Sequence, residues 1–158
     1  MKKFAANYLV SDTGKFLKNG IVVATEEGEA VEFIDPGEEL REIAQLIFFN
    51  GILITNYRYN RIHSEFRSDV TFSHLVSLII QLTAELNEVT VQNVIETGKQ
   101  VQVRFPEMTI PQIFIEISNS LLNGGRFSGM NVPGIYLLSG VNLSELKFTS
   151  RSKLKKIL

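Results

Sequence analysis

Two residues with the chemistry of a metal or proton-transfer site lie close together in this chain. His63 and Glu65 alternate, so on an extended strand both side chains would lie on the same face. An imidazole beside a carboxylate can bind a divalent metal ion or transfer a proton. No second histidine follows His63 at two or four residues, and nothing nearby supplies a nucleophile. We therefore expect no catalytic residue, metal ligand or cofactor, and His63 and Glu65 are the candidates if either activity exists.

Apolar strands precede these residues in the sequence. Two apolar runs between Leu46 and Ile54 flank Asn50-Gly51, which is the strongest short-range signal of a β-hairpin. A second pair of this kind, Asn19-Gly20, predicts another tight turn between extended segments. Short apolar runs predict further strands at 4–10, 21–24, 135–138 and 153–158, and alternating residues predict one at 30–34.

Helical periodicity replaces this alternation in the middle of the chain. Apolar residues recur three and four positions apart and predict a helix over 70–86. Between Val89 and Val103 the signals conflict, because a helix ending at Gly98 and a later strand both fit. A second helix is predicted to begin at Thr109, which with Gln112 forms a capping box.

The apolar face of the 70–86 helix needs a covering surface. Burying one large apolar side chain stabilises a protein by roughly 1.5–3 kcal/mol, so leaving five or six exposed would cost on the order of 10 kcal/mol. That cost is comparable to the stability of a whole domain. The helix therefore packs either on the sheet or on another chain, and we predict a homodimer or a contact with another protein. The predicted interface residues are Phe72, Leu75, Ile79 and Leu82.

Composition excludes several classes of function. The chain of 158 residues has a net charge of −1 and no cysteine. It therefore has no disulfide or thiolate site, and no overall field that would attract nucleic acid. No run of 18 apolar residues predicts a membrane span, and the first residues lack the apolar region of a signal peptide. We expect a cytoplasmic protein that binds neither nucleic acid nor membranes.

Three segments resemble the two ends of metal-dependent amidohydrolases of the deaminase type. They are ANYLVSDTGKFLKNGIVV, LIFFNGILI and GIYLLSGVNLSELKFTSRSKLKKIL, and residues 105–129 are similar to the last helical region of that family. The resemblance implies an α+β fold with a β-sandwich, the composite domain, built from residues 1–54 and 130–158. It also implies one domain over 1–158, with two or three helices between 66 and 128. Residues 55–129 would then be a helical remnant of the family's catalytic barrel.

The resemblance fails where the family binds its metal. Its first barrel strand ends in a His-x-His pair, and the matching residues here are Arg61 and His63. Arg61 is permanently cationic and cannot donate to a metal. Residues 66–104 number 39, whereas a (β/α)₈ barrel takes about 250. The resemblance thus implies a truncated, non-catalytic interaction, regulatory or oligomerisation module. The alternative is a residual or repurposed metal-dependent hydrolase or deaminase acting on C–N bonds through His63 and Glu65.

Overall fold

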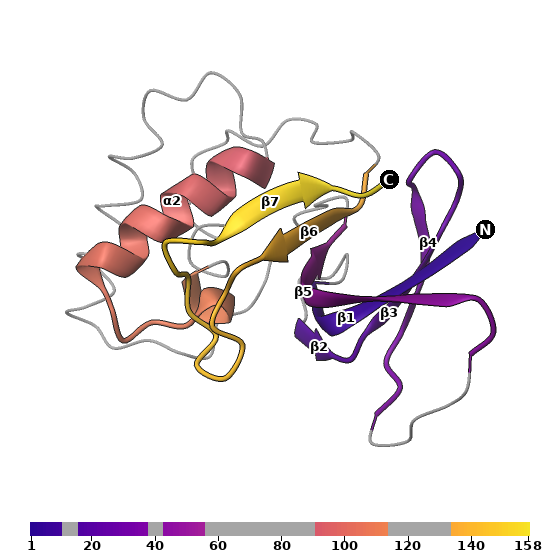
Figure 1. Ribbon diagram of the computed structural model, residues 1–158, viewed down its shortest axis with the longest axis horizontal. Coiled ribbons are helices and arrows are strands. Elements are labelled where there is room, and N and C mark those ends of the chain that lie inside the picture. Colours follow the sequence, from indigo (N-terminus) through magenta and orange to yellow (C-terminus); the bar gives the residue numbers. More distant parts are fainter. Residues whose placement is uncertain (11–15, 38–42, 56–90, 114–133) are drawn as a thin grey trace.

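The computed structural model describes residues 1–10, 16–37, 43–55, 91–113 and 134–158 (Figure 1). In this part of the chain, one mixed sheet of seven strands lies beside helical segments, which confirms the predicted α+β class. Helix α2 spans Val91–Arg104, and a further helix begins at Ile110. The strands are β1 (Lys2–Val10), β2 (Phe16–Lys18), β3 (Ile21–Ala24), β4 (Ala30–Ile34), β5 (Leu46–Ile54), β6 (Tyr136–Ser139) and β7 (Lys153–Lys156).

The two ends of the chain meet in this sheet. Its strand order is β4-β3-β1-β5-β6-β7, and β2 also pairs with β1. β1 and β5 run parallel, whereas each of the other pairs in the sheet is antiparallel. Ile52 of β5 lies opposite Leu138 of β6, which in turn lies opposite Leu154 of β7. Residues 1–54 and 130–158, which the resemblance assigns to one β-sandwich, therefore contribute their strands to a single mixed sheet.

The predicted hairpin turn at Asn50-Gly51 is wrong, because β5 runs through both residues without reversing. The register between β1 and β5 shifts by one residue between Ala6 and Tyr8, so Asn50 and Gly51 form a β-bulge. The Gly51 N–H donates to Oδ1 of Asn7 at 2.8 Å, and Gly51 has a φ of 145°. Glycine suits both a hairpin turn and a bulge, since both require backbone conformations that a Cβ disfavours.

The predicted tight turn at Asn19-Gly20 is confirmed, since the Gly20 N–H donates to the Leu17 carbonyl at 3.3 Å, but the strands on either side of it do not pair with each other. β2 and β3 both pair with β1 in the same register, with Leu17 opposite Leu9 on one side of the pair and Ile21 opposite Ala5 on the other. Asn19 adopts a φ of 54° and donates its N–H to the Asn7 carbonyl at 2.9 Å. Asn19 and Gly20 therefore form a kink between β2 and β3, which lie end to end along β1, and they do not join two strands that pair with each other.

These irregularities form a single row across three adjacent strands, which we call the crease. The crease consists of Asn7, Asn19, Gly20, Asn50 and Gly51. Because the irregularity shifts the side-chain alternation of a strand by one residue, it changes the face to which later side chains point. In β1, Phe4 and Leu9 consequently contribute to the same core although they are five residues apart.

The sheet therefore supports two hydrophobic cores. The sheet core joins the β1–β3–β4 region to the end of the chain and contains Phe4, Ala6, Leu9, Val22, Ala24, Leu53 and Ile135. The helix core joins the sheet to the helical segments and contains Val10, Ile52, Ile54, Ile95, Val101, Ile110, Ile113 and Leu138. Figure 1 shows β6 and β7 between α2 on one side and β1, β3 and β4 on the other.

Helix α2 resolves the conflict between Val89 and Val103. The strand alternative is wrong, and so is the predicted helix end at Gly98, because α2 continues to Arg104. Gly98 lies within the helix where the Phe148 ring packs closely, so that a Cβ there would be 3.0 Å from a ring carbon. The glycine provides room for a neighbouring side chain instead of ending the helix.

The predicted start of the next helix is confirmed. The Thr109 N–H donates to Oε1 of Gln112 at 2.9 Å, which is the hydrogen bond of a capping box. The Ile113 N–H donates to the Thr109 carbonyl at 3.0 Å, which forms the first helical turn. Pro111 lies inside that turn, where its missing N–H costs nothing.

Candidate functional site

The predicted site and interface residues lie outside the described residues. This applies to Arg61, His63 and Glu65, and to the predicted interface of Phe72, Leu75, Ile79 and Leu82. Both histidines of the chain are therefore outside the part that the structure describes. Within that part, no three His, Cys, Asp or Glu side chains are placed to hold one metal ion.

The structure does describe the edge of the sheet from which the chain leaves towards His63. Since β1 and β5 are parallel, their carboxyl ends at Val10 and Ile54 lie together. Thr55 follows β5 and is buried, and its hydroxyl donates to the Val10 carbonyl at 3.4 Å. In open α/β sheets, ligand sites form outside the carboxyl ends of parallel strands. His63 follows eight residues after Thr55 in the sequence, so this edge is the described part nearest to it along the chain.

Polar side chains of α2 fix the helix to the segments around it. Gln102 donates from Nε2 to the Met108 carbonyl and accepts the Phe148 N–H at Oε1, both at 2.9 Å. Lys99 donates from Nζ to the Ser152 carbonyl at 2.5 Å. Sequence reasoning missed these roles, because it placed Gln102 on the polar side of a possible strand. In a helix that continues past Gly98, Lys99 and Gln102 lie three residues apart and therefore share one face, whereas in a strand they do not.

The buried hydroxyl of Ser152 stabilises the turn before β7. Its Oγ donates to the Gly140 carbonyl at 3.1 Å and accepts the Thr149 N–H at 2.8 Å. The Thr149 hydroxyl also donates to the Gly140 carbonyl. Gly140 has a φ of 72°, and a Cβ there would overlap the Arg151 carbonyl. These contacts give Ser152 a structural role, with no histidine among the described residues to activate it as a nucleophile.

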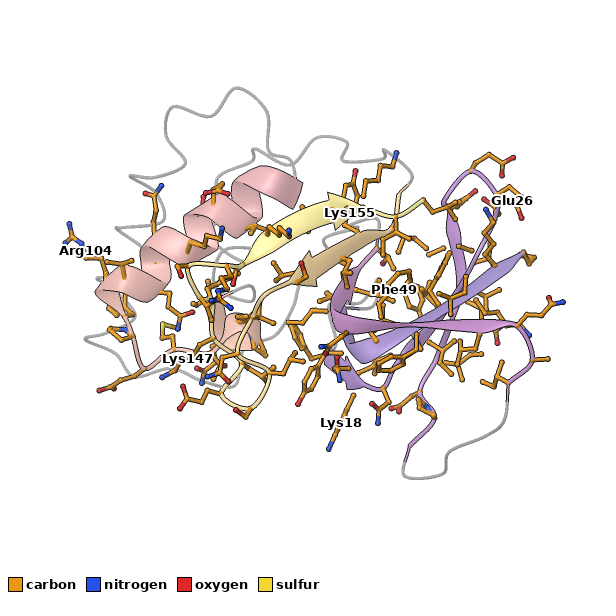
Figure 2. The ribbon with its side chains drawn as sticks, viewed as in Figure 1. Lys18, Glu26, Phe49, Arg104, Lys147 and Lys155 are labelled. Atoms are coloured by element: carbon orange, nitrogen blue, oxygen red, sulfur yellow. The ribbon has the colours of Figure 1, made fainter. Side chains whose placement is uncertain are left out.

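The two end strands of the sheet carry opposite charges. β4 contains Glu32, and Glu29 and Asp35 flank it. β7 contains three exposed lysines, and Figure 2 labels one of them, Lys155. The strand predicted at 153–158 is confirmed over Lys153–Lys156, where Leu154 packs against the helix core while Lys153 and Lys155 are exposed.

Glu26 forms ion pairs near the acidic end strand with Lys2 and with the N-terminal ammonium group. The Lys2 Nζ is 2.9 Å from Oε2 of Glu26, which is labelled in Figure 2. The hydrogen bond from Lys2 holds the pKa of Glu26 below its ordinary value. The ion pair with Lys2 joins β1 to the turn after β3. Because Glu26 is fully exposed, the pair adds little to the stability of the protein.

An apolar strand edge became visible only in the structure. Residues 46–49 of β5 pair with β1, whereas β6 pairs with β5 from Ile52 onward. Ile47 and Phe48 are 49% and 56% exposed. The adjacent Phe49, labelled in Figure 2, instead packs in the sheet core with its ring 5.9 Å from that of Phe4. The predicted hairpin would have paired this edge with residues 52–54, so the sequence analysis missed it.

Comparisons with known proteins identified no relative of this chain. Searches of family models, curated proteins and solved structures found no match for the chain. In the described residues no helix is long and apolar enough to cross a membrane. The resemblance to amidohydrolases therefore stays a prediction from the sequence.

Proposed function

We propose that this chain is a non-catalytic interaction module with the composite-domain architecture of an amidohydrolase. The observation that carries this proposal is the sheet shared by the two ends of the chain, in which β6 lies next to β5, and β7 lies next to β6. A composite domain is built in the same way, from the two ends of a chain around an inserted segment. Here the inserted segment runs from Thr55 to Ile135.

The length of this insertion supports the loss of the catalytic barrel. Residues 55–135 number 81, and α2 alone takes up 14 of them. A complete (β/α)₈ barrel needs about 250 residues. The ligand inventory supports the same proposal, since a catalytic zinc site normally uses three protein ligands and this chain has two histidines and no cysteine. Arg61 stands where the resemblance to amidohydrolases places the first histidine of the metal-binding His-x-His pair.

Interaction is the proposed role because the inserted segment carries a surplus of apolar residues. The periodic face of Leu75, Ile79 and Leu82 would cover a barrel in an intact amidohydrolase. Without the barrel, the energetic cost of exposing this face favours contact with the sheet or with another chain. We propose that the contact is with another chain, as a homodimer or with a different protein.

A second candidate function is a residual hydrolase or deaminase that uses His63 and Glu65. The parallel pair of β1 and β5 favours it, because the carboxyl ends of such strands are where α/β enzymes place their ligands. This candidate requires a bound divalent metal to activate water.

One experiment tests both candidates: size-exclusion chromatography with light scattering, followed by metal analysis of the eluted protein. We expect a dimer or larger species without stoichiometric metal. Ile79→Glu is expected to shift the dimer towards monomer, because a carboxylate would be buried in the predicted interface. Ser77→Glu is the matched control, since its position falls on the opposite side of the same predicted helix.

Two results would contradict the proposed module. Stoichiometric zinc, iron or manganese that is lost in His63→Ala would support the hydrolase. A dilute, well-folded monomer that captures no partner, and whose stability is unaffected by Ile79→Glu, would remove the reason for an interaction role.

A further inference from the structure

We propose that the first half of β5, residues 46–50, pairs with the same segment of a second copy of this chain. The inference rests on the proposed interaction function and deepens it by naming a surface and a partner. It uses a strand edge that the structure describes, which is distinct from the predicted 70–86 helix. Adding an extended segment to an open sheet edge is a common mode of protein recognition.

The edge is open in the described part of the chain. β5 has two neighbours in the sheet, and β6 pairs with only the residues from Ile52 to Ile54. Beside residues 46–49, β1 provides hydrogen bonds on one side, and no described strand lies on the other. Unpaired backbone N–H and C=O groups along an exposed edge are ready to pair with another strand.

Side-chain exposure along this edge supports pairing. Phe48 and Ile47 are each about half exposed, and they are consecutive, so they present apolar surface on both faces of the strand. A second strand added at this edge would cover part of both side chains. Among the described residues, the other exposed large apolar side chains lie elsewhere: Met1 precedes β1, Val31 lies on β4 and Val103 lies on α2.

The absence of charge along this edge favours a second copy as the occupant. From Ile43 to Thr55 the chain contains no charged residue, so two copies of this edge approach each other without repulsion. By contrast, two copies of β4 would bring Glu32 near its equivalent, and two copies of β7 would align lysines. Like charges placed opposite each other destabilise a strand pair. Edge lysines also protect natural sheets from self-association.

An antiparallel pair of identical strands closes on itself around a two-fold axis. Such an isologous contact gives a dimer and leaves no free edge for further copies at that site. With the axis near Phe48, the two Phe48 side chains lie side by side, and facing aromatic residues stabilise antiparallel pairs. Facing Cα atoms in such a pair are about 4.5–5.5 Å apart. This spacing is within the range of about 4.4–6.8 Å that a disulfide bond spans.

The test exploits the absence of cysteine in the chain. Phe48→Cys gives a full-length protein with a single thiol, and mild oxidation is expected to convert most of it to a disulfide-linked dimer. Val103→Cys is the matched control, because Val103 is 77% exposed but lies on α2. Equal cross-linking of both variants, or none with Phe48→Cys, would overturn the inference.

A reversible measurement accompanies the cross-linking. In sedimentation experiments, Phe48→Lys is expected to weaken the dimer at least about tenfold, because it removes apolar area and places two cations at the axis. Val103→Lys is expected to leave the dimer unchanged. Circular dichroism verifies that each variant is folded, which Phe48→Lys permits because the side chain is already half exposed.

The remaining outcomes separate this inference from the proposed function. If Ile79→Glu dissociates the dimer and Phe48→Lys does not, the edge is not the interface, although the interaction module stands. If high salt and Lys155→Glu dissociate it and Phe48→Lys does not, copies associate through their acidic and basic end strands, which also overturns the inference. Metal that binds through His63 would contradict the proposed function without bearing on the edge.

Discussion

At the scale of single residues, Gly51 shows how one backbone position can connect three strands. Its N–H donates to Asn7 of β1, and its Cα faces β6 so closely that a Cβ would lie 2.5 Å from the Leu138 carbonyl oxygen. That oxygen belongs to the backbone and cannot move without disturbing the pairing of β5 with β6. The position is therefore restricted to glycine by space as well as by its φ.

Gly51→Ala is expected to destabilise the protein by more than about 2 kcal/mol, because steric overlap adds to the cost of the backbone conformation. Gly37→Ala separates the two effects. Gly37 also has a positive φ, of 61°, but a Cβ there would meet no atom within 4 Å. Its expected cost is only about 1 kcal/mol, from the left-handed conformation alone. Urea denaturation measures both, and equal losses would contradict the steric explanation.

At the scale of elements, α2 is fixed by side chains that bond to the backbone of other segments. Gln102 satisfies the Met108 carbonyl, which follows the helix, and the Phe148 N–H, which precedes β7. Replacing the side chain with an apolar one leaves two partly buried backbone groups without their partner. Such groups cost about 1–3 kcal/mol when they lose a hydrogen bond.

Gln102→Leu is accordingly expected to lower the free energy of unfolding by about 1–3 kcal/mol. Gln100→Leu provides the control, since Gln100 is exposed on the same helix and its replacement is expected to change stability by less than about 0.5 kcal/mol. Chemical denaturation followed by circular dichroism compares them. Similar effects of the two substitutions would mean that the Gln102 contacts add nothing.

The elements also show what the sequence can and cannot predict. Local patterns sufficed for β1, β3, β4 and β6, because a short apolar or alternating run bounded by turn residues is typical of a strand. They failed at Asn50-Gly51 and Gly98, where the need for glycine came from a neighbouring strand and from the Phe148 ring. A contact between distant segments leaves no local pattern. For the same reason, His63 and Glu65 could be proposed from residue type, whereas the open edge at Phe48 depended on knowing the pairing of β5.

At the scale of the whole molecule, β6 links the two chain ends to each other. Leu138 is fully buried in the helix core, and its strand pairs with both β5 and β7. If the joint sheet is one cooperative unit, weakening β6 must weaken β1 equally, although the two strands are more than a hundred residues apart.

Leu138→Ala is expected to cost about 2–5 kcal/mol through loss of buried area and the resulting cavity. Native-state hydrogen exchange is expected to show the same loss of protection for the slowest amides of β1 and β6. Val103→Ala, at an exposed position, serves as the control and is expected to change neither. Loss of protection in β6 with β1 unchanged would mean that the two ends fold separately.

The crease has a further consequence for how this chain can evolve. Phe49 and Leu53 of β5 both pack in the sheet core, whereas Ile52 and Ile54 pack in the helix core. Deleting one residue at Asn50 would turn Ile52 and Ile54 towards the sheet core and Leu53 towards the helices. Connecting loops can gain or lose residues because they bury little. The length of β5, by contrast, is constrained to nine residues by its pairing with β1. We expect an insertion or deletion in β5 to be tolerated only together with a matching change in β1.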